Sequence, residues 1–142
     1  MSVRTKVVVS LINSGEVLLA EGYDPANGVQ FYIPLGGGVE FGELLEDAAR
    51  REVSEEVGLQ LGELEYRTHI ENIYVFNGTP GHEMVFHFLA RIDDESRKLL
   101  PTHGVEDNGD EFPIRWFPQE ELHRVREHVV PTGIYSDIDQ AL

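Results

Sequence analysis

The order of apolar and polar residues along the chain predicts a sheet interrupted by helices. Short runs rich in β-branched or aromatic residues, bounded by Gly, Pro and Asn, predict strands. These runs are residues 3–12, 17–20, 31–33, 66–76, 84–92 and 114–117. The Asn-Gly-Thr-Pro-Gly segment at 77–81 is strong turn chemistry and predicts that the two strands around it form a hairpin.

Helical patterns occupy the remaining regular segments. Residues 43–57 contain good helix formers and no proline, and Gly58 follows as a suitable C-terminal cap. Pro118 suits the first turn of a helix running to about His128. A short helix is expected in the tail, after the break at residues 131–133.

Two segments are expected to lack regular structure. The glycines at 36–38 are expected to break it, and residues 93–111, acidic and punctuated by Pro and Gly, are interpreted as a long surface loop. No internal repeat or linker divides the chain. The simplest assembly is therefore one α/β domain over residues 1–142, with two or three helices around a sheet.

The helix at 43–57 carries glutamates on the face that should be buried. At about 100° per residue, Glu52 and Glu56 fall within about 20° of Leu45, which belongs to the apolar stripe. Glu55 lies about 80° to one side. Unpaired carboxylates there would cost several kcal/mol each and would repel one another.

Two partners could neutralise these carboxylates. Arginine is one, but Arg51 alone lies on the adjacent side of the helix. Hard divalent cations are the other. Clustered glutamate oxygens without His or Cys suit Mg²⁺ or Mn²⁺ rather than Zn²⁺, and Mg²⁺ commonly binds substrate phosphates as well. The pattern therefore points to phosphate chemistry.

Composition narrows the choice of partners. The 142 residues include 26 acidic and 11 basic ones, giving a net charge of −15. Residues 37–59 and 93–111 each contribute −5. Such a balance argues against general nucleic-acid binding and against docking on anionic membranes. The chain has no cysteine, which excludes disulfides and thiolate metal sites, and a cytoplasmic location is expected.

The acidic helix belongs to a longer motif. Gly37, Glu43 and residues 51–59 (REVSEEVGL) follow the pattern Gx5Ex7REUxEExGU, where U is aliphatic, at all defined positions. This pattern is the Nudix box, and the chain resembles the Nudix hydrolase family. A Trp116-Phe117 segment leading into a helix also resembles the family's layout.

The resemblance implies a fold and a site. It implies an α/β/α sandwich around a mixed sheet, with the box as a loop–helix–loop. It also implies hydrolysis, with Mg²⁺ or Mn²⁺, of a nucleoside diphosphate linked to another moiety. The residues implied are metal ligands at Glu52, Glu55, Glu56 and the Gly37 carbonyl, and the bracing pair Glu43 and Arg51.

Several further residues are candidates for the same chemistry. A glutamate takes the proton of the attacking water in this family, and it comes from the box or from a distal loop. Glu111, just ahead of the Trp116 strand, is the distal candidate, and the alternative for this residue is a solvated loop. Glu83 and His87 share one strand face and could line a substrate cleft, and Phe31 could stack on a base.

The favoured hypothesis is a Nudix pyrophosphohydrolase acting on a nucleotide, including a housecleaning enzyme for nucleoside triphosphates. The alternative is a Nudix-fold sensor or regulatory module that binds a nucleotide without turnover. The intact glutamates favour the enzyme, because a sensor does not need all three. The sequence leaves the oligomeric state open, with a homodimer among the choices.

Overall fold

The computed structural model describes residues 1–142 and contains eight strands, four α-helices and one 3₁₀ helix. The strands are β1 (Arg4–Asn13), β2 (Glu16–Asp24), β3 (Val29–Ile33), β4 (Leu35–Gly38), β5 (Glu65–Phe76), β6 (Thr79–Arg91), β7 (His103–Val105) and β8 (Glu111–Pro118). The helices are α1 (Leu45–Val57), α2 (Asp94–Leu99), α3 (Gln119–Arg124), the 3₁₀ helix η1 (Arg126–His128) and α4 (Ile134–Ala141). None of the helices is long and apolar enough to cross a membrane.

The strands form a mixed sheet in the order β5-β6-β1-β2-β8-β7, with β3 paired to β2 and β4 paired to β1. β1 and β6 run parallel, and the other pairs are antiparallel. The predicted hairpin at residues 66–92 is confirmed as β5 and β6. One edge of β1 is shared, because β4 pairs with Lys6–Val9 and β2 pairs with Leu11–Asn13.

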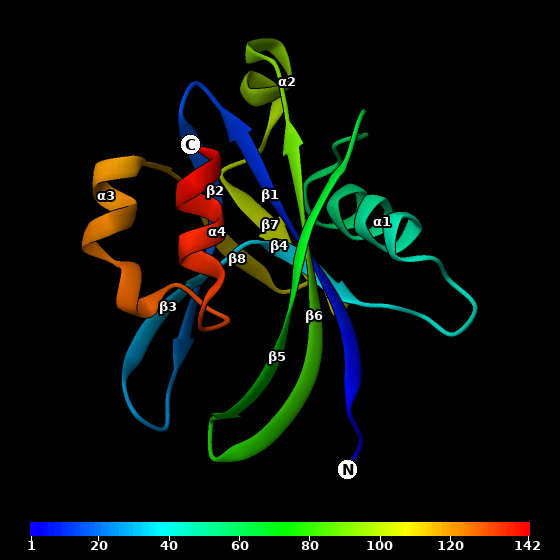
Figure 1. Cartoon of the computed structure of the whole chain (residues 1–142), viewed down its shortest axis with the longest axis vertical. Coiled ribbons are helices and arrows are strands. Elements are labelled where there is room, and N and C mark those ends of the chain that lie inside the picture. Colours follow the sequence, from blue (N-terminus) through cyan, green and yellow to red (C-terminus); the bar gives the residue numbers. More distant parts are fainter.

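Helices cover both faces of this sheet, which makes three layers. Figure 1 shows α1 on one side of the strands and α3 and α4 on the other. Alternate residues of β1 supply both cores: Val7 packs with α1, whereas Val8 packs with α3 and α4. The α/β fold class and the sandwich of helices around a mixed sheet are confirmed.

The prediction that residues 36–38 break regular structure is wrong. They form β4, whose Gly36 and Gly37 pair with Val8 and Val7 of β1. A Cβ at Gly36 would collide with the Val7 carbonyl oxygen, so only glycine lets the two backbones come this close. The glycines therefore serve close packing of strands rather than an irregular loop.

The prediction of one long loop over residues 93–111 is also wrong. Asp93 caps α2, its side chain accepting a hydrogen bond from the Ser96 N–H at 2.8 Å. β7 then pairs with the start of β8, so that Val105 lies opposite Glu111. Residues 100–102 and the turn between β7 and β8, which contains Glu106, remain irregular.

The helix predictions need smaller corrections. α1 begins at Leu45, two residues later than predicted, and ends as expected with Gly58 in the left-handed conformation at φ 73°. Pro118 precedes α3, which stops at Arg124 and continues only as η1. Four α-helices are present where two or three were predicted, because α2 lies in the segment interpreted as a loop.

A series of hydrogen bonds between buried and partly buried side chains links α4 to the sheet. Ser10 Oγ lies 2.7 Å from His87 Nε2, and Asp137 of α4 lies 2.7 Å from His87 Nδ1. Arg67 of β5 also donates to Asp137. His87 is completely buried, and this burial lowers its pKa, with Asp137 opposing and Arg67 assisting the shift.

The lowered pKa of His87 predicts the direction of the pH dependence of stability. Below about pH 6.5 the unfolded chain protonates this imidazole while the folded protein resists protonation, so the free energy of unfolding falls as pH drops. His87 contributes at most about 1.4 kcal/mol per pH unit. Urea unfolding of wild type and His87→Gln at pH 7.5, 6.5 and 5.5 measures this contribution. An equal slope in both proteins would contradict it.

Candidate functional site

The face of α1 that carries the glutamates lies against β4. Glu52 is buried, with 7% of its surface exposed, Glu56 is half-buried and Glu55 is exposed. The Glu56 carboxylate accepts a hydrogen bond from the Gly36 N–H at 2.9 Å. The helical phase deduced from the sequence is therefore correct for these three residues.

Arg51 joins this helix to the loop and strand before it. Its guanidinium donates to Glu43 at 2.8 and 3.0 Å, to Glu52 at 2.9 Å and to Glu55 at 3.3 Å. It also donates to the Gly38 carbonyl at 2.9 Å. The Arg51 hydrogen bond lowers the pKa of Glu43 to about 2. The structure thus brings together the bracing pair expected from the box.

Glycines and carboxylates enclose a cavity of about 330 Å³ beside α1, which we call the acidic cavity. It has no apolar lining residue. Its lining residues are Arg4, Gly36, Gly37, Gly38, Glu52, Glu56, Glu106, Asp107 and Asn108. The last three come from the turn between β7 and β8, so the acidic cavity unites the two acidic segments of the sequence.

The acidic cavity disfavours ionised carboxylates when no cation is present. Burial raises the pKa of Glu56 to about 8, and the nearby charges of Glu52 and Glu106 push in the same direction. Burial also raises the pKa of Glu52, against the opposing effect of Arg51. A cation bound in the cavity would offset the cost of burying the ionised Glu52 and Glu56 carboxylates and the repulsion between them.

The donor set fits a hard divalent cation. Every acidic side chain that lines the cavity offers carboxylate oxygen, the ligand type that Mg²⁺, Mn²⁺ and Ca²⁺ prefer. A Cβ at Gly37 would overlap the Glu52 carboxylate, so glycine provides the room in which that carboxylate sits. The side chains do not yet converge, since no three acidic groups are positioned to hold one ion.

Two candidates from the sequence lie elsewhere. Glu111 is exposed at the start of β8 and does not line the acidic cavity, whereas Glu106 and Asp107 of the same acidic segment do. His87 points into the opposite face of the sheet, where Ser10 and Asp137 occupy both ring nitrogens.

Phe31 and Glu83 instead line a second cavity, of about 390 Å³, which we call the aromatic cavity. Phe31 meets Phe76 edge-on with ring centroids 6.0 Å apart. Burial and the adjacent Glu83 carboxylate raise the pKa of Tyr74, which lines the same cavity. Sequence reasoning missed Thr132, on the segment before α4, because nothing local indicates that this segment returns to β3.

A sequence model of the NUDIX domain matches residues 2–135. The chain belongs to the Nudix family. It is 32% identical over 130 residues to the NAD-capped RNA hydrolase NudC of Vibrio parahaemolyticus, a match that covers 89% of this chain and 42% of that protein. The chain thus spans less than half the length of this curated relative.

Solved structures agree on the Nudix fold. The MutT NUDIX hydrolase of Burkholderia pseudomallei has a TM-score of 0.66 at 19% identity, covering 97% of this chain and 99% of the other. A NUDIX hydrolase of Nitrosomonas europaea also has a TM-score of 0.66, at 22% identity, covering 99% and 89%. The family match and the curated relative support a hydrolase, and Nudix hydrolases generally use divalent metal ions.

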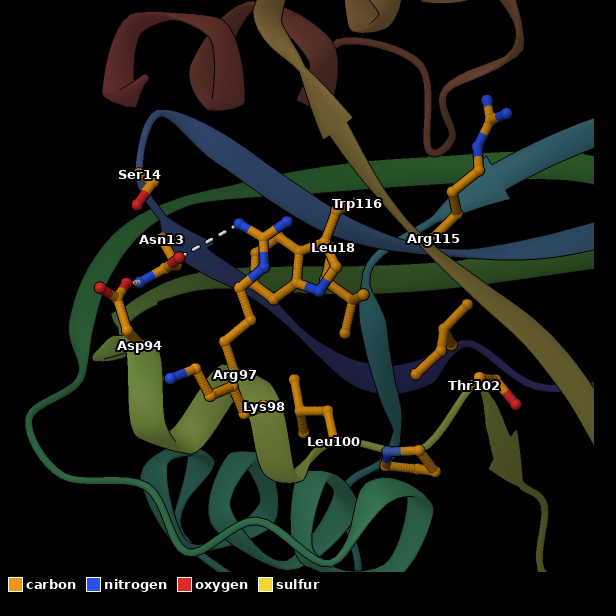
Figure 2. Close-up of a pocket in the computed structure, with 12 residues that line it drawn as sticks. Asn13, Ser14, Leu18, Asp94, Arg97, Lys98, Leu100, Thr102, Arg115 and Trp116 are labelled. Carbon is orange, nitrogen blue, oxygen red and sulfur yellow. Dashed lines mark hydrogen bonds between the residues drawn. The ribbon is translucent and has the colours of Figure 1, made fainter.

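A third cavity of this Nudix domain, of about 680 Å³, lies near the other end of β1 (Figure 2). Arg97 of α2 stacks 4.2 Å from the ring centroid of Trp116 and donates to Asn13 at 3.1 Å and to Glu16. Asn13 donates in turn to Asp94 at 3.0 Å. These polar groups satisfy one another, and Arg97 covers the indole.

The close approach at Gly37 predicts the effect of a small substitution. In Gly37→Ala the new methyl group displaces the Glu52 carboxylate, so we expect affinity for Mn²⁺ to fall about tenfold or more. Gly62→Ala is the matched control, because a Cβ there meets no atom within 4 Å. Calorimetric titration with Mn²⁺ measures both variants. Equal affinities would show that Glu52 does not contribute to metal binding.

Proposed function

We propose that this protein hydrolyses the pyrophosphate linkage of a nucleoside diphosphate linked to another moiety, with nucleoside triphosphates among its substrates. The observation that carries this proposal is the presence of two cavities, one acidic and one aromatic, that are each lined in part by β1. A metal-bound pyrophosphate suits the first, and a nucleoside suits the second. Lys6 of β1 lines the aromatic cavity while pairing with Gly38, which lines the acidic one.

The proposed roles are those that the Nudix box implies. Glu52, Glu55, Glu56 and the Gly37 carbonyl would hold Mg²⁺ or Mn²⁺, which would neutralise phosphate charge and lower the pKa of a bound water. The hydrogen bonds between Arg51 and Glu43 hold the loop before α1 against the helix. Glu55, the exposed member of the set, which contacts Arg51, would accept the proton of the attacking water. The cytoplasmic location and the oligomeric state stay predictions.

Binding without turnover is the second candidate function. The aromatic cavity alone would serve a nucleotide sensor, since it needs no cation. The acidic cavity favours the enzyme, because a sensor gains nothing from the desolvation cost that raises the pKa of Glu56. Product release from a panel of nucleoside triphosphates, sugar conjugates and dinucleotide-capped substrates, with Mg²⁺ or Mn²⁺, separates the two.

Glu55→Gln tests the site of the proposed hydrolase. We expect kcat to fall by about 100-fold or more, because an amide cannot accept the proton. Glu46→Gln is the control, since Glu46 is an exposed residue on the same helix. Steady-state rates on the best substrate of the panel provide the measurement. If Glu55→Gln retains the full rate, the site assignment fails. If wild type turns over nothing, the hydrolase proposal fails.

Phe31→Ala tests the aromatic cavity as the nucleoside site. Loss of one stacking partner should raise KM about tenfold and leave kcat unchanged. Phe41→Ala makes the same change at a fully exposed position in the loop after β4. Thermal unfolding of both variants separates lost packing from lost binding. Equal KM values in the two variants would place the nucleoside elsewhere.

A further inference from the structure

Two cations at the start of β1 border the two cavities of the proposed site. Arg4 lines the acidic cavity, and Lys6 lines the aromatic cavity. They are two residues apart on one strand, so their side chains leave the strand on the same side. A ligand that reached both cavities would meet Arg4 in the acidic cavity and Lys6 in the aromatic cavity.

Neither the Arg4 nor the Lys6 side chain forms an ion pair with a carboxylate of the protein. Six of the eleven lysines and arginines form ion pairs with carboxylates, and Arg4 and Lys6 do not. Their charges nevertheless change the pKa of residues that line the two cavities. Lys6 lowers the pKa of Glu56, opposing its burial, and Arg4 lowers that of Tyr74. They supply positive charge without a protein partner that neutralises it.

The Arg4 side chain lies beside Gly38 of β4. A Cβ at Gly38 would lie 3.4 Å from Arg4 Nη2, an ordinary van der Waals distance, so the guanidinium lies against the backbone of β4. Gly38 faces Lys6 in the strand register. Both cations thus flank β4, which itself lines the acidic cavity.

We propose that Arg4 and Lys6 bind the phosphate groups of the substrate as they cross from the aromatic to the acidic cavity. Lys6 contacts the phosphate next to the nucleoside, and Arg4 contacts the phosphate farther along. This inference rests on the proposed function and adds to it two residues that bind the phosphates of the substrate. Two unpaired cations offset the repulsion that Glu52, Glu56 and Asp107 exert on such a polyanion.

Binding of methylenediphosphonate, a pyrophosphate mimic that cannot be hydrolysed, tests the proposal apart from turnover. Calorimetry in Mg²⁺ should show dissociation constants about tenfold or more higher for Arg4→Gln and Lys6→Gln than for wild type. Arg91→Gln is the matched control. It removes the same charge from β6 opposite Ile12, at the far end of β1 from Arg4, and should bind like wild type.

Conservative variants and kinetics complete the test. Arg4→Lys and Lys6→Arg should recover most of the affinity, which a folding defect would not allow. On a hydrolysed nucleotide, Arg4→Gln and Lys6→Gln should raise KM with little change in kcat. The proposal is overturned if wild type does not bind the diphosphonate, or if both glutamine variants bind it like Arg91→Gln. The Glu55→Gln experiment reports separately on hydrolysis.

Discussion

The arrangement of α1, β4 and the loop between them beside the acidic cavity depends on the guanidinium of Arg51. It contacts carboxylates from the loop and the helix and a carbonyl from β4, and its hydrogen bond to Glu43 is the main cause of its raised pKa. Removing it would leave partly buried carboxylates facing one another without a cation, a strongly destabilising situation in proteins. The spacing of eight residues between Glu43 and Arg51 therefore matters as much as the glutamates themselves.

A second constraint acts on β4 from both of its sides. Gly36 must come close to the backbone of β1, and Gly37 must leave space for the Glu52 carboxylate. The Gly36 N–H meanwhile bonds Glu56. A side chain at either position would push the strand away from β1 or the helix away from the strand. The consecutive glycines are thus a packing requirement of the acidic helix, and the cavity exists because they lack side chains.

Sequence patterns within one helix or strand correctly predicted which face of that element each residue occupies. The helical period placed Glu52 and Glu56 on the buried side because one residue every 100° needs no tertiary information. The period of two placed Glu83 and His87 on one strand face, but it could not show that α4 covers His87. The capping of α2 by Asp93 was a local signal, visible in the Asp-x-x-Ser spacing, that the acidic composition masked.

The turn between β7 and β8 shows why the sequence alone could not identify every residue that lines the acidic cavity. Which carboxylates reach the cavity depends on the register of β7 with β8: pairing of Val105 with Glu111 holds Glu111 in the ladder and leaves Glu106 and Asp107 in the turn beside α1. Burial is the main cause of the raised pKa of Glu56 and Glu52, and the charges of Glu106 and Asp107 add to it, so a cation bound here would release protons. The net charge of −15 is therefore partly a property of the free protein, because a cation bound among these carboxylates would offset much of it where it is most concentrated.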